Sequence, residues 1–164
     1  MPGKNRREVI EMLGGIAVVA SLVFVGYEIR QNTIVARASA YQTIGVATAE
    51  AFNSSAHDLR YLETLQKQPE DLTDIEWAQK IAKSTVYARI CETVLLQVEQ
   101  GLLAEDAMER LGCRGWKSTA EEQWMVCAWR EVRRWTSDAF RDYVEESQDF
   151  SSVDCSIFPK VSFY

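Results

Sequence analysis

Histidine, proline and glycine are scarce in this 164-residue chain. It has one histidine, His57, together with three prolines and eight glycines. Ser-His and Cys-His nucleophilic sites need a histidine base that a third group holds in place. His57 stands alone in a predicted turn, where a solvent-exposed histidine is the ordinary outcome. We therefore expect no catalytic residues, and we predict that the protein is not an enzyme.

The short motifs that hold metals, phosphates and redox centres are also missing. The sequence contains no C-x-x-C pair, no Glu-x-x-His pair, no D-x-D-x-D-G loop and no glycine-rich phosphate loop. Adjacent acidic residues occur at 105–106, 121–122 and 145–146, but neighbours on a helix point in different directions, as on a solvated face. The sequence predicts no cofactor and no metal site.

Positive charge is in deficit, with 18 basic against 24 acidic side chains and a formal net charge of −6. A chain of this kind lacks the basic surface that binds nucleic acid, so we expect no nucleic-acid partner. Hydrophobic residues make up 47% of the chain, which is enough to form a core and excludes a disordered protein.

A sixteen-residue stretch without charge, residues 12–27, lies between Glu11 and Glu28. As a helix it spans about 24 Å, and Ile10 and Ile29 extend its apolar length toward the ~30 Å of a bilayer core. It is apolar on all sides, which is typical of a helix in lipid or in a deep core. We expect a single transmembrane helix that contacts the lipid bilayer through residues 12–27.

Two other interpretations of this stretch are open. A cleaved signal peptide needs a small-residue cleavage site soon after the apolar run, whereas the A-x-A-like residues 36–40 follow a polar segment. A buried helix of a soluble protein is the second alternative, because short apolar runs often have that role. The all-round apolar character favours the membrane anchor.

The flanks of the apolar stretch bear on its orientation in a cell inner membrane. Only lysine and arginine count in the positive-inside rule, and the imbalance weakly favours an N-terminus in the cytoplasm. Three basic residues precede the stretch and two follow it: Lys4, Arg6 and Arg7 against Arg30 and Arg37.

Small residues recur on one face of the same predicted helix. Gly14, Ala17 and Ser21 are spaced by three and four positions. Such a face allows a second helix to approach closely, although small residues are common in any membrane helix. These residues are our candidates for helix packing within the membrane.

Residues 29–33 read I-R-Q-N-T and are followed by Arg37 and the pair Tyr41 and Gln42. Later in the chain, a helix ending in residues 99–103 leads to a tryptophan-containing segment and then to residues 137–144. These segments resemble a loosely defined group of uncharacterised bacterial proteins, in which an apolar helix is followed by such a signature. The resemblance implies a membrane anchor joined to a helical domain, and it implies no activity.

Beyond residue 30 the pattern is helical throughout. Thr73 and Glu76 form a capping-box pattern before an amphipathic stripe that runs from Trp77 through Leu95 to Leu102. Gly101 is the predicted C-cap of this helix. Further helices are predicted over 59–67, 104–111 and 138–147, and Ser118 with Glu121 resembles a second capping box.

No alternating strand pattern occurs, so we predict an all-α fold: a single N-terminal transmembrane helix continuing into a small helical bundle. The first helix is expected to extend to about Asn53. The predicted parts are an anchor with its basic flank over 1–30, a helical bundle over 31–149 and an irregular tail over 150–164.

The four cysteines have two predicted environments. Cys91 and Cys127 fall on apolar helix faces, where a free cysteine behaves as a small hydrophobic residue. Cys113 and Cys155 fall in loops and could pair with each other if the domain is periplasmic. The sequence alone does not determine the connectivity.

An aromatic helix supplies the candidate interface. Trp124 and Trp135 share the predicted inner stripe, whereas Trp129 is offset from it and is expected to be partly exposed. Arg133 and Arg134 form a basic patch beside it, and tryptophan and arginine are enriched at binding hot spots. A solvated helix face is the alternative for the two arginines.

These features predict a membrane-anchored helical interaction or scaffold protein whose partner is a second copy or another membrane protein. A small oligomeric channel is a second hypothesis, but residues 12–27 offer only Ser21 as a polar lining group. A membrane-tethered sensor that binds a ligand among the aromatic residues of the bundle is the third.

Overall fold

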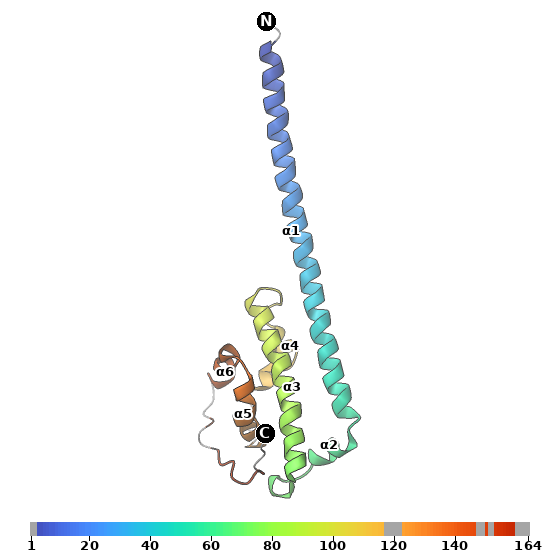
Figure 1. Ribbon diagram of the computed structural model, residues 1–164, viewed down its shortest axis with the longest axis vertical. Helices are drawn as coiled ribbons and strands as arrows, with labels where there is room; N and C mark the ends of the chain where they lie inside the picture. Colours follow the sequence, from blue (N-terminus) through green and yellow to red (C-terminus); the bar gives the residue numbers. More distant parts are fainter. Residues whose placement is uncertain (1–2, 117–122, 147–149, 151–152, 160–164) are drawn as a thin grey trace. The chain divides into compact units, whose positions relative to one another are not determined.

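The computed structural model describes residues 3–116, 123–146, 150 and 153–159. These residues form helices and connecting turns without a strand, so the predicted all-α fold is confirmed (Figure 1). The elements in chain order are α1 (Gly3–Ala56), α2 (Leu59–Thr64), η1 (Pro69–Asp71), α3 (Asp74–Glu99), α4 (Ala107–Arg110), α5 (Gln123–Val132), η3 (Arg133–Trp135) and α6 (Asp138–Glu145).

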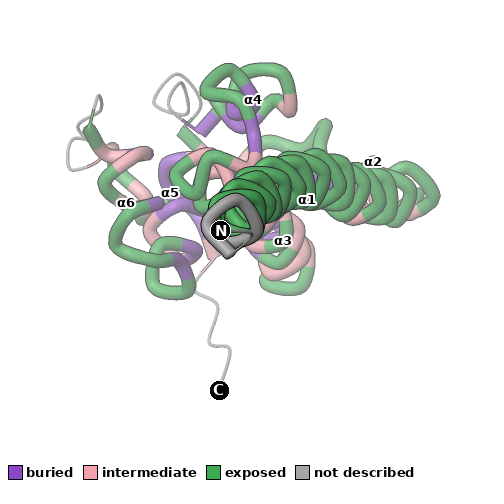
Figure 2. Tube along the Cα trace, turned by 90° about the horizontal axis from the view of Figure 1, so that it is seen from above, coloured by how far each residue is buried: buried purple, intermediate pink, exposed green. Residues whose placement is uncertain are grey.

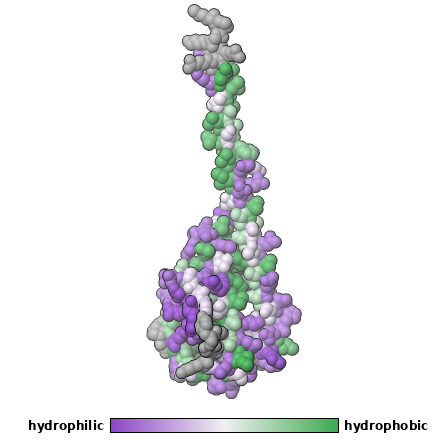
Figure 3. Space-filling model, viewed as in Figure 1, coloured by the Kyte–Doolittle hydropathy of each residue, from purple (hydrophilic) through white to green (hydrophobic). Residues whose placement is uncertain are grey.

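The chain divides into two compact units, residues 1–39 and residues 40–164. Within the first unit, every residue from Glu8 to Ser39 is exposed, and Figure 2 shows this part of α1 in the exposed colour. Hydrophobic residues cover much of its visible surface (Figure 3). By length and composition, α1 is the one helix among the described residues that could cross a membrane, which is compatible with a single-pass membrane protein.

The second unit has its core on α3, which contacts α2, α4 and α5. The last part of α1 adds Ala40 and Ile44 to this core. Largest among the fully buried side chains are Trp116, Trp129 and Phe140. Burial of apolar surface of this kind supplies the main free energy that favours the folded unit.

Local signals in the sequence place the ends of α3. The Thr73 hydroxyl accepts a hydrogen bond from the backbone N–H of Glu76 at 3.3 Å, and the Glu76 carboxylate accepts one from the backbone N–H of Thr73 at 3.0 Å. This capping box satisfies two backbone donors that a helix start otherwise leaves unpaired. Leu72 and Trp77 are both buried beside it, as a hydrophobic staple requires.

The C-terminal end of α3 is set by Gly101, whose φ of +69° is costly for residues with a Cβ. The N–H of Leu102 donates to the carbonyl of Gln97 at 2.9 Å, and the N–H of Gly101 donates to that of Val98 at 2.9 Å. This pair of bonds is a Schellman motif, and it confirms the predicted role of Gly101.

Other predicted helices exist but are shorter than expected. The helix predicted over 59–67 ends at Thr64, and the one predicted over 104–111 covers only Ala107–Arg110. The helix predicted from Asp138 begins there, with the Ser137 hydroxyl accepting a hydrogen bond from the N–H of Phe140 at 3.3 Å. The predicted capping box of Ser118 and Glu121 lies outside the described residues.

Two disulfides join segments of the second unit, and they differ from the predicted pairing. Cys91 of α3 is bonded to Cys113, and Cys127 of α5 is bonded to Cys155. The expectation that Cys113 could pair with Cys155 is therefore wrong, as is the interpretation of Cys91 and Cys127 as free hydrophobic residues. Each helix cysteine faces the loop cysteine that follows it in the chain.

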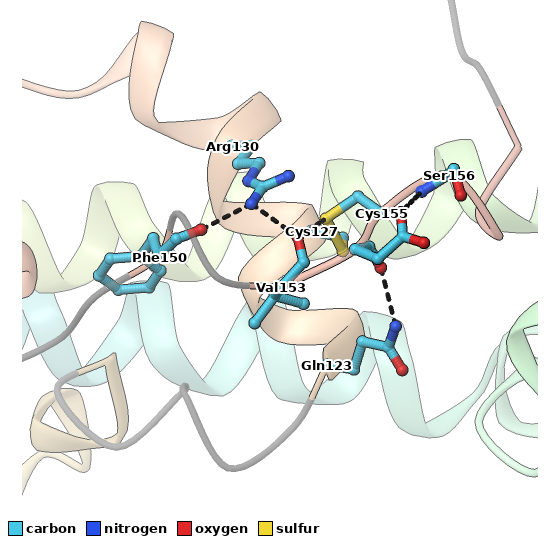
Figure 4. Close-up of a disulfide and its surroundings, with 8 residues drawn as sticks. Gln123, Cys127, Arg130, Phe150, Val153, Cys155 and Ser156 are labelled. Atoms are coloured by element: carbon cyan, nitrogen blue, oxygen red, sulfur yellow. Dashed lines mark hydrogen bonds between the residues drawn. A yellow bond between two sulfur atoms is a disulfide. The ribbon is translucent and has the colours of Figure 1, made fainter.

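The second disulfide belongs to a set of contacts that hold residue 150 and residues 153–155 against α5 (Figure 4). The Arg130 guanidinium donates to the carbonyls of Phe150 and Val153 at 2.6 and 2.7 Å. Gln123 donates to the carbonyl of Asp154 at 2.8 Å. This part of the predicted tail is irregular as expected, yet it packs on the bundle: the ring of Phe158 lies 4.6 Å from that of Trp77.

Candidate functional site

Trp129 is buried, with none of its side chain exposed, so the expectation of partial exposure is wrong. Its ring lies 5.4 Å from that of Trp116 and 6.0 Å from that of Phe140, measured between centroids. Its indole N–H donates to the Glu145 carboxylate at 2.9 Å. Because α6 and Phe150 cover the side of α5 that lies off the predicted stripe, Trp129 is part of the core.

The two arginines beside Trp129 are exposed and paired with acidic side chains. Arg133 forms an ion pair with Glu145 at 2.9 Å, the same carboxylate that accepts from Trp129. Arg134 forms an ion pair with Glu131, one turn earlier in the chain. The predicted patch of Trp129, Arg133 and Arg134 therefore has a buried aromatic side chain and two neutralised cations.

The exposure of Trp124 and Trp135 also differs from the prediction that both face inward. Trp135, expected to face inward, is 45% exposed, whereas Trp124 is half-buried. α5 ends at Val132 and the chain continues as the 3-10 helix η3, which has a different number of residues per turn. A helical spacing carried from Trp124 to Trp135 therefore assigns Trp135 to the wrong face.

Two further predicted positions have simple surroundings. His57 is exposed just after α1, and its Nδ1 lies 2.9 Å from the carbonyl of Asn53. In the apolar part of α1, the Ser21 hydroxyl donates to the carbonyl of Ala17 at 2.8 Å, and beyond the neighbouring backbone of α1 itself nothing lies within 4 Å of a Cβ built on Gly14. The face formed by Gly14, Ala17 and Ser21 is thus open to lipid or to another helix.

The second unit contains a cavity of about 320 Å³, and Trp116 and Trp124 are among the residues that line it. Ligand pockets usually have volumes of about 300–1,000 Å³ and mostly apolar walls with a few polar groups. Here the walls come from residues 48–55 of α1, Tyr61 of α2, residues 83–90 of α3, Trp116 and the start of α5. Because five separate segments contribute, no spacing in the sequence marks the site.

One ammonium group lies on the wall of this pocket. Lys83 donates a hydrogen bond to the carbonyl of Ser54 at 3.1 Å and a longer one to the Ser54 hydroxyl at 3.4 Å. Its Nζ is 3.7 Å from the Asp58 carboxylate, and it stands 4.9 Å from the centre of the Tyr61 ring in a cation–π arrangement. These contacts fix the ammonium beside the α1–α2 turn.

Two tyrosines belong to the polar part of the pocket, together with Thr48, Ser54, Ser55 and Ser84. Burial raises the pKa of Tyr87 above its usual value, and burial together with the Asp58 charge does the same for Tyr61. The Tyr87 hydroxyl donates to the carbonyl of Gly112 at 2.8 Å. A Cβ at Gly112 would stand 3.2 Å from this hydroxyl, and its φ is +78°, so glycine suits this position on both counts.

The described residues contain no group of three or more histidine, cysteine, aspartate and glutamate side chains that could hold a metal ion. The strongest candidate site is therefore a mostly apolar pocket with one cation, two phenols and four smaller hydroxyl side chains.

Comparison with protein-family models, with curated proteins and with solved structures finds no match for this chain. The resemblance to membrane-anchored bacterial proteins with an I-R-Q-N-T signature stays a prediction. Any functional proposal must therefore rest on the chain's own residues.

Proposed function

We propose that this chain is a single-pass protein of the cell inner membrane that carries a helical binding domain on the oxidising side of the bilayer. One observation carries the proposal: the second unit holds two disulfides, while α1 is long and apolar enough to span a bilayer. Disulfides persist in the periplasm and outside the cell and are rare in the cytosol.

The charge of the flanks supports the same orientation by an independent route. The basic residues before the apolar stretch outnumber those after it, which favours retention of the N-terminal flank in the cytoplasm. The domain that follows would then lie on the opposite side of the membrane, where its cysteines can be oxidised.

We further propose that the protein acts by binding rather than by catalysis. Its single histidine, His57, is exposed, and its Nδ1 lies within hydrogen-bonding distance of the carbonyl of Asn53. The pocket favours ligand binding. The pore hypothesis is weaker, because the Ser21 hydroxyl, the polar group that residues 12–27 offer to a pore, is hydrogen-bonded to the carbonyl of Ala17 within its own helix. The bilayer and a second copy, or another membrane protein, are the proposed partners of α1.

Reporter fusions test the orientation directly. Alkaline phosphatase fused after Tyr164 should be active, because it folds only on the oxidising side, and a cytoplasmic fluorescent reporter fused at the same place should stay dark. The chain itself should resist carbonate extraction from membranes. An active cytoplasmic reporter, or release of the intact chain by carbonate, would refute the proposal.

A further inference from the structure

We propose that the pocket of the second unit binds a single-chain amphiphile with a carboxylate head, a ligand of the fatty-acid class, and that Lys83 holds the head. This inference rests on the proposed binding role and names the ligand class of the same site. It follows from the charge of the pocket, the hydrogen-bonding capacity of its polar groups and the nature of its walls.

The sign of the charge in the pocket is the first argument. Lys83 is the only charged side chain among the described residues that line it, and its ion pair with Asp58, which is not a lining residue, is long at 3.7 Å. A positive group inside an apolar wall attracts an anion more strongly than the same group in water does. It also repels a cationic ligand, which the surrounding aromatic rings could otherwise bind.

Hydrogen-bonding capacity at the head site is the second argument. The Lys83 ammonium has three N–H groups and makes one bond of ordinary length, to the Ser54 carbonyl at 3.1 Å. Asp58, at 3.7 Å, lies beyond hydrogen-bonding distance. The centre of the Tyr61 ring lies 4.9 Å from the Lys83 Nζ, and its phenol hydroxyl is a second hydrogen-bond donor among the lining residues.

The apolar walls are the third argument. Val86, Ile90, Met125 and the rings of Trp116 and Trp124 form much of the apolar wall of the cavity. Phe52, also a lining residue, is 75% exposed, and a bound alkyl chain would remove part of its surface from water. A cavity of about 320 Å³ is at the lower end of ligand pockets, which favours one chain over the two chains of a phospholipid.

The experiment uses the full-length protein in isolated membranes and a medium-chain alkyl carboxylate that bears a photoreactive diazirine. After irradiation, mass spectrometry compares labelling of peptides from residues 48–55 and 83–90 with labelling of residues 12–27. The membrane segment serves as an internal standard, because any lipid-like probe labels it. We expect an excess of unlabelled carboxylate to suppress labelling at the pocket but not at residues 12–27.

Matched variants on α1 test where the alkyl chain of the ligand lies. Ala51→Phe fills the pocket and should lower pocket labelling at least fivefold, whereas Ala49→Phe, on the exposed face two residues earlier, should leave it unchanged. Val86→Phe provides a second filling variant at a half-exposed wall position, in case Ala51→Phe disturbs the fold.

Variants of Lys83 test whether this residue binds the carboxylate head. Lys83→Met should raise the carboxylate concentration needed for half-saturation about tenfold, the usual cost of a lost charge-assisted hydrogen bond. Lys83→Arg should restore most of the affinity. The corresponding alkyl alcohol should bind wild type and Lys83→Met equally.

Three results would overturn the proposal: pocket labelling that does not saturate, pocket labelling unchanged by both filling variants, or equal labelling by carboxylate and alcohol. None of these depends on the orientation of the domain. The reporter fusions can therefore fail while the pocket still binds the carboxylate, and the reverse also holds.

Discussion

Trp129 shows that the apolar pattern of one helix does not determine which of its side chains are buried. Its offset from the apolar stripe of α5 predicted exposure, yet its ring is covered by α6 and by Phe150, which belong to later segments. A stripe describes one helix, whereas burial depends on everything that packs around it. The same reasoning failed for Trp135, where a change of helix type altered the direction of the side chain.

Replacement of Trp129 tests its place in the core. Trp129→Ala should lower the free energy of unfolding by ~3–5 kcal/mol, because it leaves a cavity and removes the hydrogen bond from the indole N–H to Glu145. Trp129→Phe keeps an aromatic ring and should cost less. Denaturant unfolding of the full-length chain in detergent, followed by near-UV circular dichroism, measures both. A stable Trp129→Ala protein with altered oligomeric state would instead restore the interface hypothesis.

Glu76 supplies a prediction about pH. A hydrogen bond from Lys67, and then one from the backbone of Thr73, lower the pKa of Glu76 from 4.5 to about 2. A carboxylate whose pKa is lower in the folded state stabilises the fold above its unfolded pKa, and that contribution is lost as the pH falls through the folded pKa.

We therefore expect the stability difference between wild type and Glu76→Gln to be largest above pH 4.5 and to shrink as the pH falls toward about 2. Denaturant midpoints at several pH values measure it. Glu99→Gln, at an exposed position at the other end of α3, is the control. A difference that stayed constant over this range would mean that the carboxylate is not held as described.

At the scale of elements, the sequence predicts where helices begin and end, but it does not predict which segments pack against each other. The capping box at Thr73, the turn at Gly101 and the start at Ser137 depend on residues within one turn of chain. The disulfide partners and the pocket depend on which segments meet, and a single sequence does not specify this. For the same reason Leu95, placed at the centre of the stripe of α3, is only half-buried, whereas its neighbour Val94 is fully buried.

Substitutions along α3 test this assignment of faces. Ile81→Ala removes a buried side chain and should cost ~2–5 kcal/mol, whereas Leu96→Ala, at a half-exposed position, should change stability by no more than ~0.5 kcal/mol. Thermal unfolding of the two variants under identical conditions makes the comparison. Similar losses from both would show that α3 is rotated relative to the orientation described.

The Thr73→Ala variant tests the cap separately from the core. Removal of the hydroxyl that accepts from the N–H of Glu76 should cost ~1 kcal/mol. Thr73→Ser keeps the acceptor and should be close to wild type. Equal losses from alanine and serine would show that the methyl group, and not the hydroxyl, matters at this position.

At the scale of the whole chain, the division falls within α1 and not at the end of its apolar stretch. Ala40 and Ile44 belong to the core of the second unit, although the same helix carries the apolar residues 12–27. Hydropathy identifies the exposed apolar helix, but it does not identify where that helix begins to contact the bundle.

Shortened chains test this boundary. A chain that begins at Gln31 should be recovered without detergent, folded and with both disulfides, because it keeps every described core residue. A chain that begins at Val46 loses Ala40 and Ile44 and should be less stable and more readily digested by protease. Equal resistance of the two chains would show that this part of α1 is not needed by the core.

The order of the disulfides along the chain has a consequence for how the protein is made. Four cysteines allow three pairings, and here each bridge joins cysteines that are consecutive in sequence. When a chain crosses a membrane from its N-terminal side, Cys113 emerges with only Cys91 available, and that pair can close before Cys127 arrives. Cys155 then meets a single remaining thiol. Oxidation in order of emergence therefore gives the native connectivity, so maturation should need an oxidant but no enzyme that reshuffles wrong bridges.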